Sequence, residues 1–182
     1  MRRLRGEPLN ATTRAPRAIR VCVMGVSGAG KTLVGERLAR ALGVPFLEGD
    51  DLHPLHNVER MAQGIPLTDE DRQGWLAVIA ARLAEARRTG TGLVVSCSAL
   101  KRAYRDILRT ADTGLRFVHL TGDPALIAER LSHREAHFMP AALLDSQLAT
   151  LEAPTPEEQA WSFDLADPPD AIVAEIVARL AA

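Results

Sequence analysis

Lysine is nearly absent from this chain, and its scarcity narrows the possible functions. Only Lys31 and Lys101 are lysines among the 22 basic side chains of the 182-residue sequence. Neither has an aspartate two positions later, so the Asn-Lys-x-Asp base-reading motif of GTPases is missing. A chain that otherwise uses arginine keeps lysine where a compact ammonium group on a flexible stem is required. We therefore expect both lysines to be functional, the alternative for Lys101 being an ordinary surface residue.

Other scarcities exclude further classes of protein. The formal net charge is only −1, which gives no support for a nucleic-acid or membrane partner. No apolar run approaches the length of a membrane span. The two cysteines, Cys22 and Cys97, resemble small buried residues rather than a disulfide staple, and they suit a reducing cytosol. We expect a cytoplasmic protein that binds neither nucleic acid nor a membrane.

The first 17 residues differ in composition from the rest of the chain. They are rich in arginine, threonine and proline, and they lack both hydrophobic periodicity and the apolar core of a secretory signal. An organellar transit peptide is an alternative, but Glu7 and Pro8 would interrupt its amphipathic helix. We expect 1–17 to be a disordered tail, or the product of a misassigned start codon, ahead of one domain of residues 18–182.

Residues 25–32, Gly-Val-Ser-Gly-Ala-Gly-Lys-Thr, fit the phosphate-binding loop G-x-x-x-x-G-K-[ST]. Glycines let the backbone form a concave nest of N–H groups, and the following helix adds the positive end of its dipole. In this loop Lys31 reaches the β- and γ-phosphates and Thr32 ligates Mg²⁺. The alternative is an ordinary glycine-rich turn. We predict that the phosphates of a nucleotide are bound by Gly25, Val26, Ser27, Gly28, Ala29, Gly30, Lys31 and Thr32.

Strand-like and helical segments alternate along the rest of the chain. The expected strands are Ile19–Met24, Val44–Glu48, Leu93–Ser96, Leu115–Leu120 and, less clearly marked, Trp161–Leu165. The expected helices include Thr32–Leu42, Asp69–Arg88, Leu100–Arg109, Pro124–Ser132, Pro140–Leu151 and Pro168–Leu180. Repeated strand–helix units predict an α/β fold with a parallel five-stranded sheet and helices on both faces. Ligands should then bind beyond the carboxyl ends of the strands.

Acidic residues follow the second expected strand, in Glu48-Gly49-Asp50-Asp51, whereas Leu93–Ser96 runs into a segment without acids. This placement is typical of a small-molecule kinase. Asp50 would lie near the phosphate-binding loop, where it could accept the proton of an attacking hydroxyl or hold Mg²⁺ through water. The alternative for Asp50 or Asp51 is a helix N-cap.

A kinase must also exclude water from its site, and a lid that carries arginines can do so. Arg130 and Arg134 lie four residues apart, on one helical face, and we predict a lid around residues 130–140. The alternative for either arginine is a solvated helix face. His133 and His137 share this spacing, but no glutamate follows the first histidine as a zinc motif requires.

Several blocks of sequence together resemble the gluconate kinase (gluconokinase) family of P-loop kinases. They are Gly49–Pro54 with Asn57, Met61, Gly64–Arg72, Cys97–Lys101, Tyr104–Asp106, Arg134–Met139, Leu143-Leu144, Ser146-Gln147 and Leu151-Glu152. The phosphate-binding loop alone is generic, but the His-Pro, Cys-Ser-Ala-Leu-Lys and His-Phe-Met blocks are specific. The sequence departs from the family pattern at Gly74, commonly proline, and at Ala136, commonly glycine.

The resemblance implies transfer of the γ-phosphate of ATP to the 6-hydroxyl of D-gluconate, with Mg²⁺ dependence. It also implies a nucleoside-monophosphate-kinase-like fold and a homodimer. Lys31, Asp50 and Arg134 are then the expected catalytic residues, with Arg130 and Arg134 also contacting ATP. A kinase of this fold for another acceptor, such as shikimate, and a nucleotide-binding regulator without catalysis remain the alternatives.

Gluconate is a polyol with one carboxylate, so its pocket needs a cation and several hydrogen-bond partners. The candidate substrate-binding residues are Asp50, His53, Arg72, Lys101, Tyr104, Arg105 and His137. Spacing leaves open which of them holds the carboxylate, and each has the alternative of a structural role.

Overall fold

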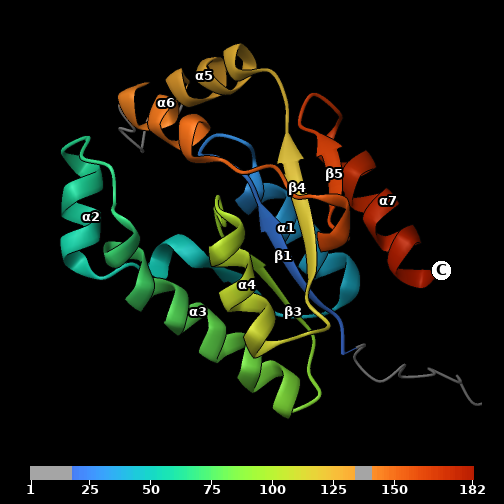
Figure 1. The fold of residues 1–182 in the computed structure, drawn as a ribbon. Coiled ribbons are helices and arrows are strands. Elements are labelled where there is room, and N and C mark those ends of the chain that lie inside the picture. The colour runs from blue at the N-terminus through green and yellow to red at the C-terminus, as the bar shows by residue number, and fades with distance from the viewer. Residues whose placement is uncertain (1–17, 134–140) are drawn as a thin grey trace, which may run out of the picture.

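The computed structural model describes residues 18–133 and 141–182 (Figure 1). The predicted tail, residues 1–17, lies outside these ranges. So do Arg134, Ala136 and His137 in the predicted lid.

A parallel five-stranded sheet forms the centre of the fold, as the sequence predicts. The strands are β1 (Arg20–Met24), β2 (Phe46–Glu48), β3 (Leu93–Ser96), β4 (Arg116–Thr121) and β5 (Trp161–Asp164), in the order β2-β3-β1-β4-β5. The central strand β1 pairs with β3 through Cys22 and Val95, and with β4 through Cys22 and Phe117. Val21 to Met24 are fully buried, because helices cover both faces of the sheet.

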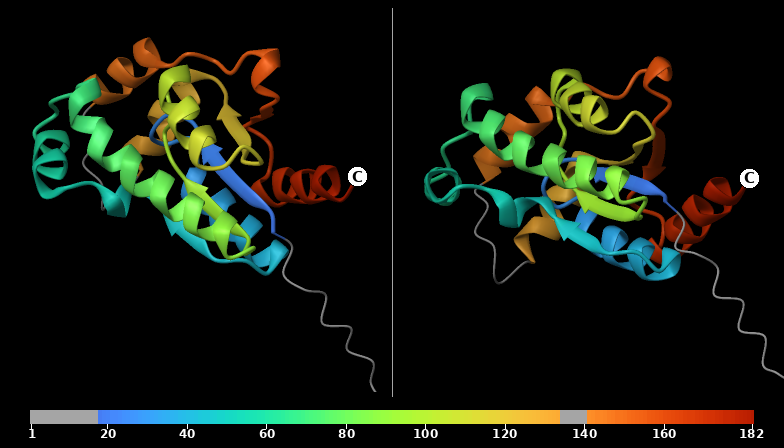
Figure 2. Two further views of the ribbon diagram at one scale, coloured as in Figure 1. Left: turned by 60° about the horizontal axis from the view of Figure 1, so that its bottom comes forward. Right: turned by 90° about the horizontal axis from the view of Figure 1, so that it is seen from below.

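Four helices form the two outer layers. Helices α1 (Lys31–Leu42) and α7 (Pro169–Ala181) pack together on one face, and α3 (Asp69–Arg88) and α4 (Arg102–Ala111) on the other. Figures 1 and 2 show these two layers from different directions. Among the described residues, no helix combines the length and apolar character needed to cross a membrane.

Helices α5 (Pro124–Ser132) and α6 (Ala141–Thr150) lie together beyond the carboxyl ends of the strands, at the top of Figure 1. Helix α5 begins sharply because Asp123 caps it, accepting a hydrogen bond from the Ala125 N–H at 2.8 Å, and Pro124 occupies the first turn. The position of α5 and α6 puts them over the edge of the sheet where a ligand is expected.

Helix α2 (Leu55–Ala62) is an element that the sequence patterns do not predict. It follows a short 3₁₀ helix, η1 (Gly49–Leu52), and stands apart from the sheet at the left of Figure 1. Its Leu55 and Val58 are exposed, by 72% and 45%. Leu55, Val58 and Ala62 do recur at helical spacing, but the helix has only 8 residues, which is too short for a helical period to be established from the sequence.

The first residue of helix α3 is fixed by a capping box. The Thr68 hydroxyl accepts from the Asp71 N–H at 3.2 Å, and the Asp71 carboxylate accepts from the Thr68 N–H at 2.8 Å. This cap places Asp69 and Arg72 in the first turn. A Cβ atom at Gly74, where the family pattern commonly has proline, would meet no other atom within 4 Å.

Candidate active site

The phosphate-binding loop connects β1 to α1 at the carboxyl edge of the sheet. Gly28 adopts φ 82°, a left-handed conformation that glycine takes without a steric penalty. A Cβ atom at this position would lie 2.7 Å from Cγ of Leu131 and 3.1 Å from Cγ2 of Ile127. Helix α5 is therefore packed directly against the loop, and only glycine fits beneath it.

Lys31 and Thr32 open helix α1, whose first N–H groups have no partner within the helix. Lys31 is 8% exposed, and its Nζ donates to the Val26 carbonyl at 3.1 Å. The Thr32 hydroxyl donates to Oε2 of Glu48 at 2.6 Å. The two side chains that the motif assigns to phosphate and Mg²⁺ thus lie at the same helix end.

Glu48, at the end of β2, is a site residue that the sequence reasoning missed. Besides the Thr32 hydroxyl, its carboxylate accepts from the Ser96 hydroxyl and, at 3.3 Å, from the Asp50 N–H. Glu48 is also the N-cap of η1, so neither Asp50 nor Asp51 takes the capping role that was the alternative for them. A signal was available, because Glu48 is the last residue of the second strand and the first of the acids in Glu48-Gly49-Asp50-Asp51.

A cleft opens in front of this loop. It is lined by Ser27, Lys31, Asp50, His53, Met61, Pro66, Leu67, Arg72, Ser98, Leu143, Ser146 and Gln147. The phosphate-binding loop lies at one end of the cleft. One wall is formed by η1, α2 and the start of α3, and another wall by α6. The structure thus brings five predicted site residues to one concave surface: Ser27, Lys31, Asp50, His53 and Arg72.

Asp50 is held in place through the backbone of the preceding residue, Gly49. The N–H of Gly49 donates to the Ser96 hydroxyl at 3.2 Å, and Nε1 of Trp75 donates to the Gly49 carbonyl at 2.7 Å. A Cβ atom at Gly49 would overlap the Ser96 carbonyl oxygen. The close approach of β2 and β3 at this point therefore requires glycine and fixes the exposed carboxylate of Asp50 at the cleft.

His53 forms part of the cleft wall as a neutral ring. It stacks on Trp75 with ring centroids 4.1 Å apart, and its Nδ1 lies 3.3 Å from Nδ2 of Asn57. Burial lowers the pKa of His53 from 6.5 to about 4, although the nearby Asp50 carboxylate acts in the opposite direction. At neutral pH the ring offers hydrogen bonding without charge.

Arg72 is the cation that the cleft presents on its α3 side. Its Cζ lies 5.8 Å from the centroid of the Tyr104 ring, within the range of a cation–π contact. Among the described residues no carboxylate forms an ion pair with it. Its guanidinium is therefore available to an anionic ligand in this part of the molecule.

Lys101 and Tyr104 meet Asp69 instead of lining the cleft. Nζ of Lys101 lies 2.8 and 2.9 Å from the Asp69 carboxylate oxygens, and the Tyr104 hydroxyl donates to the same carboxylate. The Lys101 ammonium lowers the pKa of Asp69, while burial and the bond to Asp69 raise that of Tyr104. The three side chains form one cluster beside Arg72.

Comparison with known proteins identifies the family. Residues 21–154 match a family described as an AAA domain. A gluconokinase of Gluconobacter oxydans (strain 621H) is 50% identical over 155 residues, which is 85% of this chain and 87% of that protein. A gluconokinase crystal structure from Sinorhizobium meliloti 1021 has a TM-score of 0.82 and 52% identity, covering 91% of this chain and 93% of that chain. The chain belongs to the gluconokinase family. This confirms the family that the sequence motifs predict.

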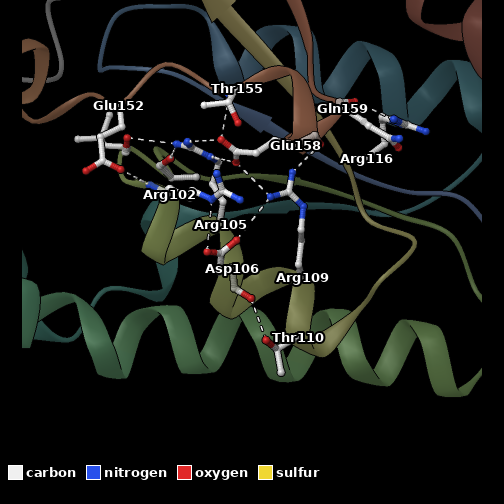
Figure 3. Close-up of polar contacts among 12 residues, drawn as sticks. Arg102, Arg105, Asp106, Arg109, Thr110, Arg116, Glu152, Thr155, Glu158 and Gln159 are labelled. Carbon is white, nitrogen blue, oxygen red and sulfur yellow. Dashed lines mark hydrogen bonds and ion pairs between the residues drawn. The ribbon is translucent and has the colours of Figure 1, made fainter.

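In this gluconokinase-family chain, Arg105 does not occupy the substrate-binding position that the sequence predicts. The side chain is fully buried, and its Nε and Nη2 donate to the Glu158 carboxylate at 2.6 and 2.8 Å. Its Nη1 donates to the carbonyls of Ala99 and Leu100, and Figure 3 shows Arg105 and Arg109 converging on Glu158. A buried charge must be paired, and these bonds pair the Arg105 guanidinium inside the protein. It therefore does not reach a ligand in the cleft.

Arg105 instead shapes the loop between β3 and α4. Ala99 has φ 44°, a left-handed conformation unusual for a residue with a side chain, and the Arg105 bond to its carbonyl holds it there. The preceding Ser98 lines the cleft, and its carbonyl accepts from the Gly25 N–H at 3.3 Å. The buried arginine thereby supports the wall next to the phosphate-binding loop.

Arg130, predicted to contact ATP, lies in the last turn of α5. Its Nη2 donates to the Leu165 carbonyl at 2.6 Å, so it connects α5 to the end of β5. His133 follows as the C-cap of the same helix. Arg134 and His137 belong to the undescribed segment, so the lid remains a prediction.

Proposed function

We propose that this chain transfers the γ-phosphoryl group of ATP to the 6-hydroxyl of D-gluconate, giving 6-phosphogluconate and ADP. The chain is a kinase of the gluconokinase family, and the gluconokinases it resembles are matched over most of their length. The observation that carries the proposal is the cleft itself. It places the phosphate-binding Lys31, the carboxylate of Asp50 and the available cation of Arg72 on one surface.

Each of these side chains has a role in the proposed reaction. Lys31 keeps one of its three donors on the Val26 carbonyl, which leaves two for the β- and γ-phosphates. The oxygen of the 6-hydroxyl bonds to the γ-phosphorus while the bond from that phosphorus to the β–γ bridging oxygen breaks. Asp50 accepts the proton that the hydroxyl loses. Arg72 binds the gluconate carboxylate through its planar pair of N–H donors.

Mg²⁺ fits the oxygen donors at the end of α1. Magnesium is usually bound by one or two protein oxygens together with substrate phosphates. The Thr32 hydroxyl and the carboxylates of Glu48 and Asp50 supply such oxygens, and in the described ranges no cluster of three or more His, Cys, Asp or Glu forms a dedicated metal cage. When bound, Mg²⁺ would neutralise charge on the phosphates. In the protein, Glu48 orients the Thr32 hydroxyl towards this position.

The other described residues of the cleft are uncharged and include both polar and apolar side chains. Ser98, Ser146 and the neutral His53 line the cleft and can bond to the hydroxyl groups of a polyol. We assign Lys101 and Tyr104 to the support of Arg72 through the Asp69 cluster. Arg130, Arg134 and His137 are proposed to complete the site when a lid closes, which would exclude water from the phosphoryl group.

An acceptor panel tests the proposal. The purified chain is incubated with ATP and Mg²⁺ plus gluconate, shikimate, glucose or a nucleoside monophosphate, and ADP release is followed. We expect turnover with gluconate to exceed that with every other acceptor by at least about a hundredfold, since an unpaired polar site rejects poorly matched ligands. Equal rates without acceptor would indicate an ATPase, and a preference for shikimate would indicate a different kinase.

We further propose a homodimer located in the cytoplasm. The support is the family resemblance and, for location, the pair of buried free cysteines, Cys22 and Cys97. Sedimentation equilibrium of the full chain would distinguish a dimer from a monomer of 19.7 kDa.

A further inference from the structure

The peptide unit between Val26 and Ser27, in the phosphate-binding loop, is held from both sides by side chains. Its carbonyl accepts from Nζ of Lys31 at 3.1 Å and from the Ala29 N–H at 3.2 Å. Its N–H donates to Oε1 of Gln147 at 2.7 Å, and Nε2 of Gln147 donates back to the Ser27 hydroxyl at 3.1 Å. Gln147 thus makes a two-point contact with one loop residue.

Peptide geometry connects the two sides of this arrangement. In a planar trans peptide the carbonyl and the N–H point in opposite directions. Rotating the unit would therefore remove the bonds on both sides and turn an N–H towards the Lys31 ammonium. The Ala29 N–H holds the carbonyl side of this peptide and Gln147 holds its N–H side. Gln147 therefore helps to fix the direction of the Val26 carbonyl, and that carbonyl positions Lys31.

Helix α6 supplies Gln147 from a well-anchored position. Gln147 is 120 residues from Ser27 in the sequence, and it lines the cleft with Ser27 and Lys31. Leu143 and Leu144, on the same helix, are each only 4% exposed. The helix is thus packed firmly enough for its glutamine to serve as a fixed reference for the loop.

We infer that Gln147 is a positioning residue for phosphoryl transfer, acting on Lys31 through the Val26–Ser27 peptide. The inference rests on the proposed kinase function but not on the identity of the acceptor. Lys31 has one donor on the loop and two for phosphates, so a misdirected carbonyl would misplace all three. Gln147 acts before and during phosphate binding without itself contacting the reacting atoms.

The test replaces Gln147 by methionine, which keeps an unbranched side chain of similar length and removes both hydrogen bonds. We expect the Kd for ATP to rise about fivefold to tenfold and kcat to fall by a similar factor, each being the effect of about one net hydrogen bond. The KM for the acceptor should change less than twofold. Asp145→Asn, an exposed change on the same helix, is the matched control and should leave all three constants unchanged.

A double-mutant cycle separates positioning from mere packing. In a Lys31→Ala background, Gln147→Met should weaken ATP binding less than twofold, because the residue it acts on is gone. Undiminished weakening in that background would overturn the inference. So would tighter ATP binding in the single variant, which would mean that Gln147 competes with phosphate, or unchanged constants. Failure of the wild type to phosphorylate gluconate would instead refute the proposed function, since ATP binding is measured without an acceptor.

Discussion

Replacing Glu158 by glutamine should destabilise the folded chain strongly while leaving its surface intact. Glu158 accepts both bonds of the Arg105 fork and a third from Arg109 at 3.0 Å, and its side chain is 1% exposed. The hydrogen bonds from Arg105 lower its pKa from 4.5 to about 2. That displacement corresponds to about 3 kcal/mol at neutral pH. Breaking a buried ion pair by removing one partner costs about 3–5 kcal/mol, so the two routes agree.

The pH dependence gives this prediction a definite sign. A carboxyl group whose pKa is lower in the folded state stabilises the fold above its unfolded pKa of about 4.5, and this stabilisation is lost as pH falls towards about 2. The stability gap between the wild type and Glu158→Gln should therefore be constant from about pH 7 to 5 and shrink progressively below that. Glutamine is neutral throughout, so the curve of the variant keeps the pH dependence of every other group, such as Asp69 and Asp71, and the difference between the two curves reports Glu158.

Urea denaturation followed by circular dichroism measures the gap. We expect a loss of about 3 kcal/mol at pH 7, and a fall in Tm of about 6–12 °C for a chain of this size. Glu85→Gln is the matched control, because Glu85 pairs with Arg88 at the surface and should cost less than about 1 kcal/mol. A Glu158→Gln variant within about 1 kcal/mol of the wild type at pH 7 would refute the reasoning.

Three further changes test the site. Asp50→Asn should lower kcat by about two to four decades with an unchanged Kd for ATP measured without Mg²⁺, and near-normal turnover would contradict its role as the base. Arg72→Ala should raise the KM for gluconate by at least about tenfold with only partial recovery in Arg72→Lys, whereas an unchanged KM would place the carboxylate elsewhere. Gly49→Ala should cost about 1–3 kcal/mol in urea denaturation, because its Cβ would overlap the Ser96 carbonyl; a neutral effect would mean that β2 and β3 can separate there.

Local patterns were sufficient wherever a feature depends on neighbours in the sequence. The phosphate-binding loop between β1 and α1 is such a case, because glycine spacing and the flanking periods are both local. The parallel sheet follows from repeated strand–helix units. Asp50 was placed at the carboxyl edge of the sheet for the same reason, and the structure has it in the cleft.

Partners distant in the sequence account for what the patterns missed. Arg105 and Glu158 are 53 residues apart, and an arginine in a buried ion pair looks the same in a sequence as one in a substrate pocket. Helix α2 was missed for a different reason: with only 8 residues it is too short for a helical period to be established from the sequence.

The sequence by itself therefore determined the phosphate-binding loop, the sheet and the kinase family, since short-range spacing and composition encode them. The tertiary structure decided which charged side chains face the cleft. It buried Arg105, joined Lys101 to Asp69 and left Arg72 available. It also brought Gln147 to the loop across 120 residues. The physical reason is that burial and pairing of charge depend on the packing of whole helices, which no local window contains.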